Sequence, residues 1–273
     1  MFTGFMINTW VVATMVAVIA GVVGTFAVLR GSAFIAHAVP QAGFAGAAGA
    51  SLIGVSTVAG LGVFALASAL GIGWLSKRGR HDAMTALGLV VMLGLGALLL
   101  SFSNEYEAAV FGLLFGQVLG ISNTDVLETA VLGLACIAAI VLLYRPLLLS
   151  SVLPEVGEAR GVDSRRMELC FLVVVALATT MTLPIVGALL MFSLMIGPAG
   201  AARAFTRRPL MAMTLSVCLA LVTVWVAIAA AYEWNWPIGF FVGVLGACFY
   251  IAGRIWARWR LGKVALPAGD AVA

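Results

Sequence analysis

The sequence predicts an all-α protein, a single bundle of about nine helices that cross a lipid bilayer. Hydrophobic residues make up 63% of the 273 residues, charged residues make up 10%, and the mean hydropathy is +1.16. A soluble domain has about 25% charged residues. Apolar runs long enough to cross a bilayer recur along the chain, without the alternating short segments of a β-barrel. We therefore expect residues 1–273 to form one transmembrane domain, with no soluble domain outside the membrane.

Each expected span is an apolar run that ends at charged or turn-forming residues. The runs lie at 9–29, 33–50, 53–75, 84–101, 124–144, 168–183, 185–202, 209–231 and 237–256. The further run 107–120 is too short to cross and lies among acidic residues, so we expect a partial helix at the outer surface. Proline removes a helical hydrogen bond, so Pro40 and Pro184 should kink or break their helices.

The positions of the charges predict the orientation. If 107–120 does not cross, all 15 Lys and Arg residues fall on one side of the membrane. They stand at Arg30, in 77–80, in 145–166, in 203–208 and from Arg254 onward, whereas Glu105, Glu107, Asp125 and Glu233 stand opposite. The positive-inside rule makes the basic side cytoplasmic. We therefore expect a multi-pass membrane protein with its N-terminus outside and its C-terminus in the cytoplasm.

Two local patterns predict details of packing and capping. Alanine and glycine dominate residues 42–50, and small residues let helices approach closely in lipid, so this segment should pack centrally. The sequence from Ser122 to Asp125 fits the start of a helix, with serine as the N-cap and aspartate three residues later.

The residue types exclude several functions. His37 is the only ionisable residue near the middle of an expected span, whereas a proton-coupled transporter needs titratable groups at depth. The chain has no Gly-x-x-x-x-Gly-Lys-Ser/Thr loop for ATP, and nothing pairs a nucleophile with a base. Its net charge of +4 comes from clusters between spans, which argues against nucleic acid binding. We expect a transport subunit that is not an enzyme, binds no cofactor and receives energy from a partner.

The longest polar stretch is the loop at about 145–167. It has several acidic and basic residues around Gly157 and Gly161, and it is long enough to form a short docking helix on the cytoplasmic side. On composition alone, a solvated connector is the better explanation of this loop.

Four motifs follow one another between Arg30 and Arg207. They are Ala-His-Ala-Val-Pro at 36–40, Leu-Phe-Gly-Gln-Val-Leu at 114–119, Glu-Ala-Arg-Gly-Val at 158–162, and Val-Gly-Ala-Leu-Leu at 186–190 with Pro-Ala-Gly-Ala-Ala-Arg at 198–203. In this order they resemble the membrane subunits of bacterial zinc, manganese and iron ABC importers. The last pair is the most specific.

The resemblance implies a location in the bacterial inner membrane, an assembly and a set of functional residues. It implies two permease copies, two ATPase subunits on the cytoplasmic side, a metal-binding protein outside, and a divalent metal ion as the transported substrate. The coupling loop would dock on the ATPase through Glu158, Ala159, Arg160, Gly161 and Val162. The signature residues would be Gly187, Pro198 and Arg203. It also implies a partial outer helix in the place of 107–120.

One position departs from the family pattern. The family usually has an aspartate one helical turn before the histidine, where carboxylate and imidazole can share one cation. Here that residue is Ala33, and only Gln41, one turn after His37, offers another oxygen. A metal path through His37 and Gln41 and a purely structural histidine both remain open at this point.

Two other functions also remain open. A secondary transporter or exporter of a small organic solute would need internal repeats and polar sites at mid-membrane. A structural membrane scaffold would need neither a partner ATPase nor a metal.

Overall fold

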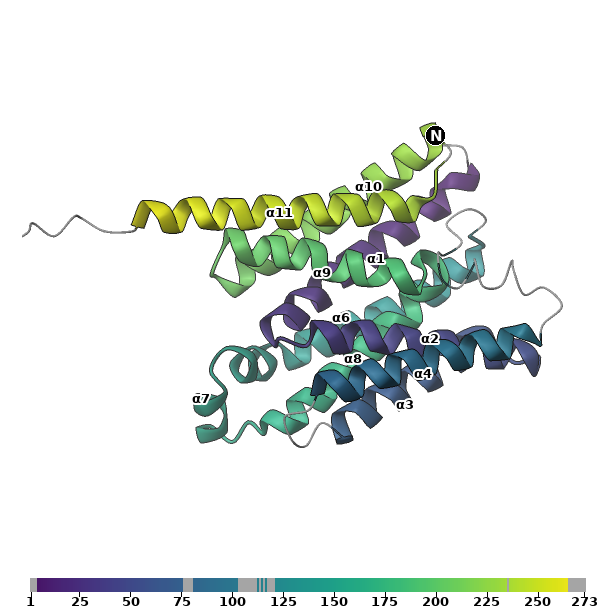
Figure 1. Ribbon diagram of the computed structural model, residues 1–273, viewed down its shortest axis with the longest axis horizontal. Coiled ribbons are helices and arrows are strands. Elements are labelled where there is room, and N and C mark those ends of the chain that lie inside the picture. Colours follow the sequence, from purple (N-terminus) through teal and green to yellow (C-terminus); the bar gives the residue numbers. More distant parts are fainter. Residues whose placement is uncertain are drawn as a thin grey trace, which may run out of the picture.

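The computed structural model describes residues 4–75, 81–102, 112, 114, 116, 121–234 and 236–264. The described chain is helical throughout, without a strand (Figure 1). Its helices are α1 (Gly4–Leu29), α2 (Ala33–Leu52), α3 (Thr57–Leu75), α4 (His81–Ser101), α6 (Asn123–Val152), α7 (Pro154–Ala159), α8 (Ser164–Val186), α9 (Ala188–Phe205), α10 (Pro209–Trp234) and α11 (Ile238–Val264). The all-α prediction is confirmed, and the predicted partial helix at 107–120 falls largely outside the described residues.

Every expected span lies on a helix, but the number of membrane crossings is not confirmed. Among the described residues, six helices are long and apolar enough to cross a membrane, namely α1, α3, α6, α8, α10 and α11. The apolar parts of α4 and α9 are shorter, at Thr85–Ser101 and Leu190–Phe205. The predicted count of about nine therefore rests on helices that length and hydropathy alone do not identify as spans.

Helix α2 occupies the interior of the bundle, as its small residues predict. It packs mainly against α3 and α4, and also against α8 and α9 (Figure 1). Residues 38–48 are buried without interruption. A Cβ atom at Gly46 would overlap the backbone of Gly60 on α3, so the two helices touch through glycine. Because α2 faces protein rather than lipid over most of its surface, it does not need the hydropathy of an outer span.

The two prolines do not end their helices. α2 runs through Pro40, and α8 runs through Pro184 to Val186. The boundary between the expected spans 168–183 and 185–202 lies at Gly187 instead, where φ is +84°. Only glycine adopts this conformation readily, so the chain turns there rather than at the proline.

Contacts at both ends of α1 show that α1 and α6 run in the same direction. Near its start, the Asn8 side chain donates hydrogen bonds to the Ile121 carbonyl at 3.2 Å and to Asn123 at 2.8 Å. Just past its end, Arg30 donates to Ser150 and Ser151 on the last turns of α6. α4 ends at the right in Figure 1, where α6 begins. The end of α4 and the start of α6 therefore lie at the same end of the bundle.

The predicted cap of α6 is confirmed. The Ser122 hydroxyl accepts a hydrogen bond from the Asp125 backbone N–H at 3.2 Å, and the Asp125 carboxylate accepts from the Ser122 N–H at 2.9 Å. This reciprocal capping box satisfies two backbone donors that a helix start leaves free. It places the start of α6 at Asn123.

Candidate translocation site and coupling segment

The two candidate path residues lie on one face of α2. His37 and Gln41 are four residues apart, one above the other on the helix. The Gln41 side chain is buried, with 1% of its surface exposed, and its Oε1 atom has no hydrogen-bond partner among the described residues. His37 is half-buried, and its buried Nδ1 likewise lacks a partner. A buried acceptor without a partner is costly, so such atoms often await a ligand or water.

The ring of Phe192 on α9 holds the imidazole. The two ring centroids lie 4.6 Å apart at 56°, within the range of favourable aromatic contacts. Thr179 on α8 also has a fully buried hydroxyl oxygen without a partner among the described residues. Phe192 on α9 therefore contacts the imidazole, and α8, which also packs against α2, has one buried hydroxyl without a partner among the described residues.

No carboxylate accompanies the histidine on α2. Ala33 is the first residue of the helix, one turn before His37. Within the described residues, no three His, Cys, Asp or Glu side chains form a group that could hold a metal ion. Imidazole nitrogen and amide oxygen are ligands that divalent cations accept, but this pair carries no negative charge. A pair of neutral ligands binds a divalent cation weakly.

The predicted coupling residues form a short exposed helix and its ending. α7 begins with a proline at its first turn and ends at Ala159. The Val162 N–H donates to the Gly157 carbonyl and the Gly161 N–H to the Glu158 carbonyl, with φ of +78° at Gly161. These bonds form a Schellman ending, which explains the glycine in the Glu-Ala-Arg-Gly-Val motif. The structure therefore has a short helix in this loop, and the loop is shorter than the expected 145–167, because α6 continues to Val152 and α8 begins at Ser164.

Most residues at the end of α7 and just after it are exposed. Glu158, Ala159, Arg160 and Gly161 are exposed, whereas Gly157 is buried against α6. The segment therefore has one inner face fixed to the bundle and one outer face directed away from it.

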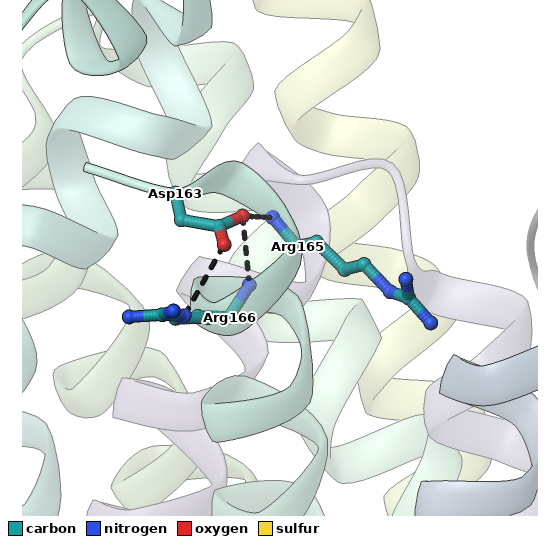
Figure 2. Close-up of polar contacts among 3 residues, drawn as sticks. All are labelled: Asp163, Arg165 and Arg166. Atoms are coloured by element: carbon teal, nitrogen blue, oxygen red, sulfur yellow. Dashed lines mark hydrogen bonds and ion pairs between the residues drawn. The ribbon is translucent and has the colours of Figure 1, made fainter. Parts of the chain in front are cut away.

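Asp163 fixes the passage from α7 into α8. Its carboxylate accepts hydrogen bonds from the backbone N–H groups of Arg165 at 2.9 Å and Arg166 at 3.3 Å (Figure 2). The Arg166 side chain adds an exposed ion pair with it at 3.3 Å. The cap contributes about 1 kcal/mol and the exposed pair less, so the backbone bonds set the start of α8.

The signature residues lie apart from one another. Gly187 joins α8 to α9, and a Cβ atom there would overlap the carbonyl oxygen of Leu114. Pro198 is buried within α9, and Arg203 lies in its last turn, where it donates to the Arg207 carbonyl at 3.3 Å. Gly187 and Arg203 therefore lie near the two ends of α9 and Pro198 lies between them, and no contact among the three is seen in the described residues.

Sequence reasoning missed two residues that the structure brings to these sites. Phe192 lies in an apolar run, and nothing in its spacing indicates the contact with His37. From the sequence, Arg30 indicated only which side of the membrane is cytoplasmic. In the structure its side chain donates hydrogen bonds to two serines of α6. An arginine at a membrane border is usually read as an anchor, so no sequence signal separates this one from the others.

The apolar helices of this fold define a helical membrane protein. The chain belongs to the ABC 3 transport family, whose profile matches residues 3–257. The family resemblance of the sequence motifs is thereby confirmed.

Individual relatives agree with this assignment. The chain is 28% identical to the manganese transport system membrane protein MntC of Listeria innocua over 86% of this chain and 85% of the relative. It is 25% identical to the high-affinity zinc uptake system membrane protein ZnuB of Haemophilus influenzae over 71% and 76% of the two chains. The solved structure of PsaBC from Streptococcus pneumoniae in complex with a Fab has the same fold, with a TM-score of 0.86, 23% identity and 96% of each chain covered.

Proposed function

We propose that this chain is the permease subunit of an ATP-driven importer of divalent metal ions. The observation that carries the proposal is membership of the ABC 3 transport family, together with relatives that transport manganese and zinc. Two features of the described residues support it. An exposed helix, α7, offers a docking surface, and buried neutral ligands on α2 offer a low-affinity step for a cation.

The orientation follows from the charges at the two ends of the bundle. The end that holds Arg30 and α7 is the cytoplasmic end, because the basic residues of the described loops gather there. The end that holds Asn8 and the start of α6 faces outward. The N-terminus then lies outside and the C-terminus in the cytoplasm. If α2, α4 and α9 cross together with the six longer apolar helices, about nine helices cross the membrane.

Energy reaches the permease from outside the chain. An ABC ATPase docks on residues 158–162, and ATP binding moves α7 against the bundle. A second permease copy completes the path beside the half-exposed His37, and an extracytoplasmic metal-binding protein delivers the ion. The ion passes His37 and Gln41 and leaves toward the cytoplasm. The neutral ligands lower the barrier to release, because no carboxylate attracts the departing cation.

Manganese is the first metal to test, because the Listeria relative transports manganese. Zinc and iron are the alternatives. The absence of a carboxylate at Ala33 weakens the site for all three metals, so selectivity depends on groups other than charge.

A complementation experiment tests the proposal. The chain is expressed with its ATPase and binding protein in a bacterial strain that lacks manganese, zinc and iron importers, and uptake of each metal is measured. We expect the intact system to restore uptake of at least one metal. Arg160→Glu, at the exposed residue that ends α7, should abolish it, whereas Arg165→Glu, an exposed arginine outside the coupling residues, should not. Equal uptake with and without an intact ATPase would contradict the proposal.

A further inference from the structure

We propose that Arg30 is a positioning residue that couples α7 to α2, so that movement of the docking helix reaches the helix that carries His37. This proposal rests on the proposed function. It assigns a role to a residue outside both the docking segment and the cation path.

The backbone around Arg30 forms a rigid corner. The N–H groups of Gly31 and Ser32 donate to the carbonyls of Val28 and Ala27, and φ at Gly31 is +69°. These are the bonds of a Schellman ending on α1, and α2 begins at once with Ala33. A turn this short and this fully hydrogen-bonded moves with both helices as one piece.

The side chain of Arg30 leaves this corner and reaches α6. Its Nη1 atom donates to the hydroxyl of Ser150 at 3.0 Å and to that of Ser151 at 3.2 Å. The guanidinium also lies over the ring of Phe171 on α8, 5.6 Å from its centroid. One side chain therefore joins the corner between α1 and α2 to the last turns of α6 and to the first half of α8.

The same turn of α6 carries α7. Ser150 lies against Gly157, whose Cβ position is 3.8 Å from the Ser150 Cα atom. Only Leu153 separates α6 from α7, and its N–H donates to the Leu149 carbonyl. A push on the outer face of α7 thus acts directly on the serine that Arg30 holds.

The contact is stronger than an exposed arginine pair. Burial lowers the pKa of the Arg30 guanidinium from its ordinary value, and the nearby Glu168 carboxylate opposes that shift. The residue stays charged at every physiological pH, because arginine titrates far above it. Hydrogen bonds to a charged and partly desolvated donor are about twice as strong as neutral ones, so this link withstands a displacement.

His37 lies one helical turn beyond the start of α2, which adjoins the corner. His37 follows Ala33 by four residues, and its ring rests on Phe192 of α9. A shift or rotation of the start of α2 changes that contact first. The contiguous sequence of parts is α7, Ser150, Arg30, the α1–α2 corner and His37.

The test uses the complete transporter in proteoliposomes, with manganese uptake and ATP hydrolysis measured on the same preparation. In Arg30→Gln we expect ATP hydrolysis within twofold of the wild type and manganese transported per ATP lower by at least about fivefold, the lower range of coupling between sites. Arg30→Lys keeps the charge and one hydrogen bond and should recover part of the ratio. Arg145→Gln, which removes an exposed arginine from the same region, is the matched control and should leave the ratio unchanged.

Hydrogen exchange on the purified permease provides a second readout that needs neither metal nor ATPase. Arg30→Gln should accelerate exchange in α7 and in the first turn of α2 together, whereas Arg145→Gln should change neither. An unchanged ratio of manganese to ATP in Arg30→Gln, or faster exchange in only one of the two segments, overturns the proposal. A wild-type complex without ATP-dependent uptake counts instead against the proposed function, while the exchange result still decides the link.

Discussion

Replacing Gly187 with alanine tests whether the junction between α8 and α9 is as tightly built as its geometry indicates. The residue has φ of +84° and ψ of 157°, a region that is essentially restricted to glycine. A Cβ atom there would overlap the Leu114 carbonyl oxygen and lie 2.5 Å from the Gly116 nitrogen. Both are backbone atoms, so no side chain can rotate away to relieve the overlap.

The expected cost has two parts. A non-glycine residue in this backbone region costs about 1–3 kcal/mol, and overpacking a tight contact costs about another 1–3 kcal/mol. The sum, roughly 2–6 kcal/mol, is a large share of the 5–15 kcal/mol that holds a typical domain folded. It corresponds to a fall in melting temperature of roughly 5–20 °C.

Thermal unfolding of the detergent-solubilised protein, followed by the loss of its monodisperse elution peak, measures the effect. Gly88→Ala on α4 is the matched control, because no atom lies within 4 Å of its Cβ position. Alanine there should leave the melting temperature unchanged or raise it slightly, since glycine weakens a helix interior. A Gly187→Ala protein that melts within 2 °C of the wild type would show that the junction between α8 and α9 accepts a side chain without strain.

Three further predictions concern α2 and the start of α6. Gly46→Ala should lower the free energy of unfolding by about 1–3 kcal/mol, because the added Cβ atom would overlap the backbone of α3. Gly49→Ala should leave it nearly unchanged, because the nearest atom to its Cβ position is 3.5 Å away. Ser122→Ala should lower the free energy of unfolding by about 1 kcal/mol and accelerate amide hydrogen exchange in the first turn of α6. An unchanged exchange rate would show that the helix does not need this cap. His37→Ala should lower manganese uptake by about tenfold, the smaller loss seen when a metal site is altered. Ala33→Asp should tighten metal binding measured by calorimetry. Normal uptake of every metal by His37→Ala would show that His37 is not a ligand.

The sequence predicted the features that depend on local chemistry. Apolar runs mark the helices, the small residues of 42–50 mark a buried helix, and Ser122 with Asp125 marks the cap of α6. Each of these follows from the residue types themselves and their spacing. The boundary at Gly187 was placed wrongly at Pro184, because a proline in an apolar run is a strong signal whereas a glycine with positive φ gives none.

Contacts between distant segments could not be predicted in the same way. Arg30 and Ser150 are 120 positions apart, and the contact between them depends on α1 and α6 running side by side. The pairing of His37 with Phe192 depends on how α9 crosses α2. Such details arise from packing, for which a single sequence has no periodic signature.

ATP-dependent metal uptake by the purified complex tests directly whether the chain is the permease of an ATP-driven metal importer. The permease and its ATPase are reconstituted in proteoliposomes, the metal-loaded binding protein is added on the outer side, and uptake of radioactive manganese is compared with and without ATP at the ATPase. We expect uptake only when ATP, ATPase and permease are all present. Manganese flux through the permease alone, driven by a metal or proton gradient, would contradict it.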